Sequence, residues 1–237
     1  MLRKQIDFWF TMGSTYTYLT VNRLPQIAKA TGAEFRWRPF HLLIILKEMN
    51  HVPFADKPAK CAYMWRDIER RAAMYGIPAR LPAPYPIANS ERANLVAIVG
   101  MREGWGADYV RAAYRHWFQA GLENGSDENI AASLREVGQD QKRVLAAAER
   151  DDTRAALIAE TKSARELGIF GSPSFVVEGE LFWGDDRLQM RLIGRVGLAS
   201  IAEGLVTPPE RLARTAHADP ASRHGSRRRV QPRHRAP

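Results

Sequence analysis

Alternating apolar and polar positions open the chain. In residues 5–12, Ile6, Phe8 and Phe10 share one face of an extended segment, a period of two that predicts a strand. Residues 34–40 alternate in the same way and predict a second strand.

Between these strands the apolar spacing changes to that of a helix. Ser14 stands at the N-cap position of this predicted helix, and Gly32 stands where it should end. The opening is therefore β-α-β, which favours a parallel pair of strands.

The middle of the chain is helical, and strands return near its end. Residues 42–167 show helical periodicity broken by a loop at 78–86 that contains four prolines. The strongest helical segments are 61–75, 90–103, 107–120, 127–137, 141–149 and 153–167. Residues 174–177 and 181–183 predict a β-hairpin, followed by a last helix over 186–196.

The composition is that of an ordinary soluble protein. Of 237 residues, 45% are apolar and 26% charged, and no apolar run approaches the roughly 18 residues of a membrane helix. The N-terminus lacks the apolar core of a signal peptide, so we expect a cytoplasmic protein that does not bind membranes. The single cysteine, Cys61, excludes an internal disulfide and a CxxC pair.

The positive charge is concentrated at the C-terminus. Residues 208–237 contain eight arginines against Glu210 and Asp219, a net charge of +6, so that the rest of the +9 chain has only +3. This segment has few apolar residues, and we expect it to be disordered. No aromatic residue lies between the arginines to stack on bases, which makes nucleic-acid binding the weaker interpretation.

The predicted order of elements, β-α-β, helical insert, β-β-α, is that of thioredoxin interrupted by helices, the DsbA arrangement. Pro173 stands where that fold has its cis-proline, although only about 5 to 6% of X-Pro bonds are cis in general. The redox motif that should begin the first helix is missing, and residues 12–16, Met-Gly-Ser-Thr-Tyr, occupy its place.

Several ordered motifs make the resemblance more specific. They are Asp7-Phe8-Trp9-Phe10 followed by Ser14, Tyr18 and Leu19; Trp37-Arg38-Pro39-Phe40; Asn50; Lys60-Cys61-Ala62-Tyr63-Met64; residues 168–175; and residues 182–188. Over residues 5 to about 190 the chain resembles the 2-hydroxychromene-2-carboxylate isomerases and the related kappa-class glutathione transferases. Thr15 and Thr17 depart from the pattern, since the family usually has proline and serine there.

The resemblance implies an α/β, thioredoxin-like fold with a large all-helical insertion. Residues 1–43 and 168–206 would form a discontinuous thioredoxin-like domain, residues 44–167 an inserted helical domain, and residues 207–237 a disordered Arg-rich tail. It also implies a homodimer that acts on a small aromatic molecule.

The resemblance further implies glutathione as a cofactor, regenerated in each isomerisation. Ser14 would be the catalytic hydroxyl that faces the glutathione sulfur, and Ser172 would pair with the tripeptide through its backbone. The full implied set of glutathione-binding residues is Ser14, Thr15, Tyr16, Asn50, Lys60, Ser172, Pro173, Asp185 and Asp186.

Other interpretations of these residues stay open. Taken alone, Ser14 is a helix cap, Asp185 and Asp186 complement a helix dipole, and Asn50 and Lys60 are surface residues. Two other functions also stay open: a kappa-like transferase or peroxidase, and a redox-inactive thioredoxin-like binding module. Cys61 could be a nucleophile, but the sequence shows no base near it.

Overall fold

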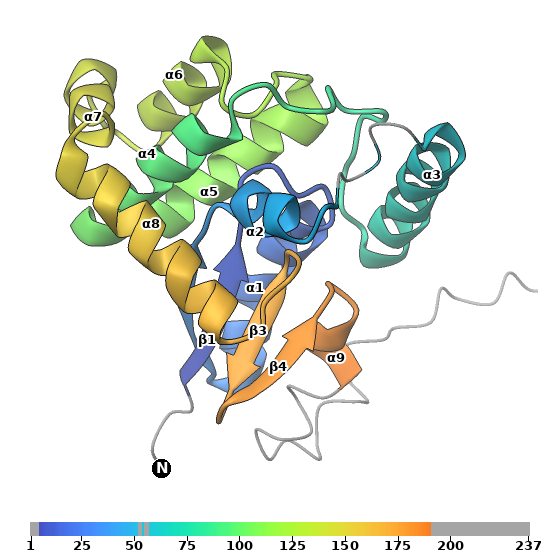
Figure 1. Cartoon of the computed structure of the whole chain (residues 1–237). Coiled ribbons are helices and arrows are strands. Elements are labelled where there is room, and N and C mark those ends of the chain that lie inside the picture. Colours follow the sequence, from blue (N-terminus) through green and yellow to red (C-terminus); the bar gives the residue numbers. More distant parts are fainter. Residues whose placement is uncertain (1–4, 52–53, 55–56, 191–237) are drawn as a thin grey trace, which may run out of the picture. The chain divides into compact units, whose positions relative to one another are not determined.

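The described residues, 5–51, 54 and 57–190 of a computed structural model, contain a four-stranded sheet (Figure 1). Its strands are β1 (Gln5–Phe10), β2 (Glu34–Pro39), β3 (Ser174–Val177) and β4 (Glu180–Trp183), in the order β2-β1-β3-β4. β1 is parallel to β2 and antiparallel to β3, which is antiparallel to β4. The predicted parallel pair and the predicted hairpin are both confirmed.

The two faces of β1 pack against different helices, as the alternation in the sequence predicts. Phe8 and Phe10 lie in the larger core cluster beneath α1 (Thr17–Thr31). Trp9 lies on the opposite face with Ile45 of α2 (Leu42–Glu48) and Ala164 of α8 (Asp151–Glu166). The central strand is thus buried on both sides.

Helices fill the chain between β2 and β3. Besides α2 and α8 they are α3 (Pro58–Tyr75), α4 (Ser90–Glu103), α5 (Gly106–Arg115), a π-helical turn (His116–Ala120), α6 (Asp127–Glu136) and α7 (Gln141–Ala148). The helix predicted over 107–120 is present, but its last turn is π-helical instead of α-helical. In this turn, contacts with distant parts of the chain accompany the departure from α-helical geometry. Phe118 stacks on Tyr18 with ring centroids 4.1 Å apart, and the Trp117 indole donates a hydrogen bond to the Pro84 carbonyl.

One apolar cluster joins the sheet to these helices. It contains Phe8 and Phe10 of β1, Tyr109 of α5, Trp117 of the π-helical turn and Leu134 of α6. The insert therefore contributes to the core of the sheet as well as to its own. The predicted domain boundaries at 43/44 and 167/168 stay a prediction.

The C-terminal predictions are mostly beyond the described part of the chain. α9 (Arg187–Met190) is the beginning of the helix expected over 186–196, while the rest of that helix and the Arg-rich tail at 207–237 lie outside the described residues. Among the residues described, no helix combines the length and the apolar character needed to cross a membrane.

Candidate active site

Ser14 lies in the turn that joins β1 to α1. Its backbone amide donates to the Thr11 carbonyl at 3.1 Å, and its hydroxyl donates to the Ser172 carbonyl at 2.7 Å. The prediction that Ser14 caps the helix is wrong. α1 begins at Thr17 after Tyr16, with no side-chain cap, because the Ser14 hydroxyl reaches across to the loop before β3 instead.

Ser172 ties that loop to both ends of the Ser14 turn. Its hydroxyl accepts from the Thr11 amide at 3.0 Å and lies 2.9 Å from the Thr17 hydroxyl oxygen. The Ser172–Pro173 bond is cis, as the order of elements suggested. Ser14, Ser172 and Pro173 are therefore brought together from positions about 160 residues apart in the chain.

The residues that lead into α1, together with its first residue, offer backbone donors beside Ser14. The amides of Thr15, Tyr16 and Thr17 donate to no acceptor within the described part of the chain. Free amides at a helix N-terminus, with the partial positive charge of the helix dipole, favour an anion. This turn can therefore stabilise negative charge next to a hydroxyl donor.

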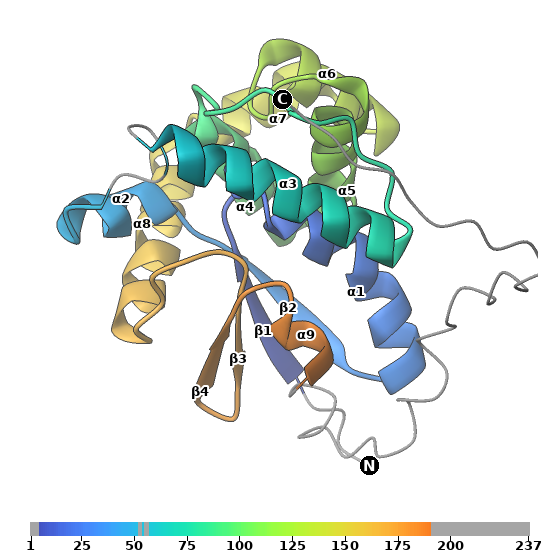
Figure 2. The ribbon, with the colours of Figure 1, turned by 90° about the vertical axis from the view of Figure 1, so that its right-hand side faces the viewer.

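One face of α3 lies over the same turn (Figure 2). The Thr15 hydroxyl lies 3.2 Å from the Met64 sulfur, and the Tyr16 hydroxyl donates to Asp67 at 3.0 Å. Burial, followed by the bond to Asp67, raises the pKa of Tyr16, so this phenol remains protonated. Lys60 is one helical turn before Met64 on this face and is exposed.

Asp185 is enclosed by two arginines. One carboxylate oxygen lies 2.5 Å from Nη1 of Arg71, and the other lies 3.3 Å from Nη2 of Arg23. Burial raises the pKa of Asp185 to about 6, against the opposing effect of both guanidiniums. Asp186 is by contrast open to solvent, with 41% of its side chain exposed. Of the two carboxylates predicted to bind an amine, Asp186 is the accessible one.

Asn50 is not brought into contact with these residues. It follows α2 with a φ of +51° and is exposed. Phe54 lies, like Asn50, in the connection between α2 and α3. The Lys60 ammonium, in α3, lies 5.4 Å from the ring centroid of Phe54. The roles predicted for Asn50 and Lys60 stay predictions.

The sequence analysis missed five residues that shape this site. Arg23 and Arg71 hold Asp185, and Asn94, Tyr114 and Asn124 bond the backbone of the Ser14 turn. Asn94 gave a signal, since it is a lone amide within the apolar run Ala93–Val99. The arginines gave none, because their partner is more than 110 residues away.

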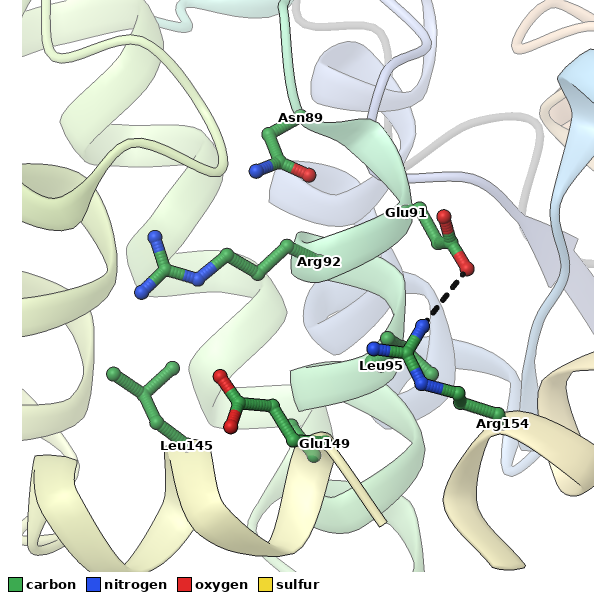
Figure 3. Close-up of a pocket in the computed structure, with 8 residues that line it drawn as sticks. Asn89, Glu91, Arg92, Leu95, Leu145, Glu149 and Arg154 are labelled. Atoms are coloured by element: carbon green, nitrogen blue, oxygen red, sulfur yellow. Dashed lines mark hydrogen bonds and ion pairs between the residues drawn. The ribbon is translucent and has the colours of Figure 1, made fainter. Parts of the chain in front are cut away.

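A cavity of about 170 Å³ lies elsewhere, between α4, α7 and α8 (Figure 3). Most of its charged side chains already have partners: Glu91 pairs with Arg154 at 3.4 Å, and Arg92 pairs with Asp127 at 2.6 Å. The described residues contain no group of three His, Cys, Asp or Glu that could hold a metal ion. We therefore place the candidate active site at the Ser14 turn.

Comparison with known proteins shows the family of the chain. Residues 5–192 match the DsbA-like thioredoxin domain. The chain belongs to the DsbA-like thioredoxin family. It is 26% identical to 2-hydroxychromene-2-carboxylate isomerase of Sphingobium xenophagum, over 79% of this chain and 95% of that protein. It is 24% identical to glutathione S-transferase kappa 1 of Caenorhabditis elegans, over 78% of this chain and 88% of that protein.

Solved structures agree with this membership. A structure of 2-hydroxychromene-2-carboxylate isomerase superposes with a TM-score of 0.73 at 27% identity, covering 81% of this chain and 95% of that one. The resemblance inferred from the sequence motifs is confirmed, and so is the DsbA-like thioredoxin fold with its helical insert.

Proposed function

We propose that this DsbA-like protein is a glutathione-dependent isomerase of 2-hydroxychromene-2-carboxylate or a similar bicyclic aromatic catabolite, giving trans-o-hydroxybenzylidenepyruvate. Support comes from its similarity to enzymes of that name over nearly four-fifths of the chain. The observation that carries the proposal is the Ser14 hydroxyl, 2.7 Å from the carbonyl that precedes cis-Pro173, beside free amides of α1.

The residues at this turn fit the sulfur of glutathione. When bound, glutathione would supply a nucleophilic thiolate. A free thiol has a pKa near 8.5, and lowering it by about 2 requires about 2.7 kcal/mol of preference for the anion. The end of α1 contributes about 0.3 to 1 kcal/mol, and a hydroxyl that bonds a charged acceptor contributes about 1.5 to 3 kcal/mol. Together they amount to about 2 to 4 kcal/mol, a range that includes the requirement, once the Ser14 hydroxyl turns from the Ser172 carbonyl to the sulfur.

The rest of the site fits the tripeptide at two further places. The backbone of Ser172 lies beside Ser14, and Asp186 is open to a positively charged amine. Asp185 would act through Arg23 and Arg71 rather than contact the amine itself, because both of its oxygens have guanidinium partners. Lys60 lies on the α3 face over the turn and would approach a carboxylate of the ligand.

Replacing Ser14 tests the proposal. Ser14→Ala removes a hydrogen bond to the thiolate that α1 cannot replace, so turnover should fall by roughly 10- to 150-fold. Glutathione affinity should change much less, because the contacts at Ser172 and Asp186 are retained. The measurements are the thiolate absorbance of bound glutathione against pH and the turnover of a hydroxychromene carboxylate.

Ser163→Ala, a serine of α8 away from the turn, is the matched control and should behave as wild type. An unchanged thiol pKa together with unchanged turnover in Ser14→Ala would contradict the proposal. If the wild-type protein fails to bind glutathione at all, the redox-inactive binding module becomes the better interpretation.

A transferase remains the second candidate, favoured by the similarity to glutathione S-transferase kappa 1. The two activities differ in what happens to glutathione. An isomerase leaves its concentration unchanged over many turnovers, whereas conjugation consumes one molecule per product. Titrating free thiol during a progress curve distinguishes them.

A further inference from the structure

Buried side chains of the helical insert bond the backbone of the Ser14 turn. The Asn94 side chain of α4 accepts from the Met12 amide at 3.0 Å and donates to the Thr11 hydroxyl at 3.1 Å. Asn124, in the loop after the π-helical turn, donates to the Met12 carbonyl at 2.7 Å. Both amide side chains are fully buried.

Tyr114 of α5 completes this set. Its hydroxyl lies 2.8 Å from the Thr11 carbonyl oxygen and 3.0 Å from the Ser14 carbonyl oxygen, and its one proton is shared between them. Burial raises the pKa of Tyr114, so the phenol keeps its proton and remains a donor. We call Asn94, Tyr114 and Asn124 the insert clamp.

We propose that the insert clamp positions the catalytic turn: it fixes the Ser14 hydroxyl and the free amides of α1 where a thiolate must sit. The clamp residues are positioning residues, since they bond backbone atoms of residues 11–14 and not the ligand. This inference rests on the proposed function.

The physical reason is the sensitivity of catalysis to small displacements. A turn between a strand and a helix has no ladder of its own to hold it, and a misplacement of about 1 Å can lower a rate by about 100-fold. The clamp supplies a buried partner for four backbone groups of the turn: the Thr11 carbonyl, the amide and the carbonyl of Met12, and the Ser14 carbonyl. The helical insert would thereby set the geometry of chemistry performed on the sheet domain.

The chain provides a matched pair of tyrosines for the test. Tyr114 and Tyr109 are both in α5 and both fully buried, and burial raises the pKa of each. The Tyr109 hydroxyl has no partner within the described part of the chain, while the Tyr114 hydroxyl bonds the turn. Replacing either with phenylalanine keeps the ring and its packing.

The experiment compares Tyr114→Phe with Tyr109→Phe. In Tyr114→Phe we expect kcat to fall by about tenfold or more with the KM for glutathione little changed, since one hydrogen bond is lost at the turn and none at the ligand. The pKa of the bound thiol should rise, and hydrogen exchange of the amides of residues 12–16 in the ligand-free protein should become faster. Tyr109→Phe should leave all of these values unchanged.

Asn124→Ala, measured in the same way, is a second probe should Tyr114→Phe fold poorly. If the clamp variants match Tyr109→Phe in exchange, thiol pKa and kcat, the inference is overturned. If the wild-type protein neither binds glutathione nor turns over substrate, the proposed function fails instead. The exchange measurement on ligand-free protein still decides whether the clamp holds the turn.

Discussion

Asp185 shows how one buried charge depends on its neighbours. Its carboxylate lies between Arg23 and Arg71, and Arg23 itself is buried with one guanidinium nitrogen unpartnered among the described residues. Removing Asp185 would leave the buried Arg23 guanidinium without its carboxylate, and an uncompensated buried charge commonly costs about 3 to 5 kcal/mol. The group therefore holds the loop before α9 against α1 and α3.

The raised pKa of Asp185 predicts a pH dependence of stability. In the folded protein this pKa is about 6, against an ordinary value of 3.8, so the folded state binds the proton more tightly. The stabilisation from this proton is complete below about pH 4 and is lost as the pH rises through about 6. The free energy of unfolding of wild type relative to Asp185→Asn should therefore fall between pH 4 and 7, by up to about 3 kcal/mol.

Urea unfolding of both proteins across this pH range provides the measurement. Asp186→Asn, the adjacent and more exposed carboxylate, is the control and should keep most of the pH dependence of wild type, because Asp186 is only a minor cause of the raised pKa of Asp185. A difference between wild type and Asp185→Asn that stays constant, or grows toward neutral pH, would be inconsistent with the prediction.

At the scale of elements, α4 and α5 meet at two glycines. A Cβ at Gly106 would lie 2.5 Å from the Met101 amide nitrogen and 2.7 Å from the Gly100 carbonyl carbon, both of them backbone atoms. Such a contact cannot be relieved by turning a side chain. The two helices can approach this closely because both positions lack a side chain.

We can therefore predict the direction in which Gly106→Ala changes the stability of the protein. Helix propensity alone would stabilise the variant by up to about 1 kcal/mol, whereas overpacking costs about 1 to 3 kcal/mol. We expect net destabilisation, seen as a lower urea midpoint with an unchanged m-value. A higher midpoint would mean that the helices move apart without penalty.

The elements themselves follow well from the sequence, because their signals are local. β1 could be predicted from the alternation of Ile6, Phe8 and Phe10, and this strand is buried with Trp9 on its other face. The π-helical turn at His116–Ala120 could not be predicted, since it depends on the packing of Phe118 against Tyr18, about 100 residues away.

The site followed from the sequence only where a motif marked it. Ser14 and Ser172 could be named from their place in the resemblance, but the bond between them joins positions 158 apart. The mistake about the Ser14 cap has the same origin. A serine before a helix looks identical in sequence whether it bonds the helix or another loop.

At the scale of the whole molecule, sheet and insert share one core cluster. This shared core, together with the insert clamp, means that the insert cannot be removed without exposing the sheet and releasing the Ser14 turn. The chain is therefore expected to act as one unit in its chemistry even though its thioredoxin-like part is discontinuous in sequence.

We also predict a homodimer, from the family resemblance and the alanine-rich insert. Large apolar side chains on the described surface include Tyr63 and Met74 of α3 and Ile158 of α8, each more than 60% exposed. Sedimentation velocity at micromolar concentration should give a species of twice the 26.8 kDa chain mass. A single species at the mass of one chain would rule out a stable dimer under those conditions.

Ser14 and Thr17 both reach Ser172, and they are separated by two residues, the spacing of a CxxC pair. Oxygen in place of sulfur at both positions removes the dithiol–disulfide couple from this loop. With Cys61 as the only cysteine, the chain cannot form an internal disulfide either. The chain therefore has no internal dithiol–disulfide couple. Under the proposed function, reduced glutathione from outside the chain would supply the sulfur that these two positions lack.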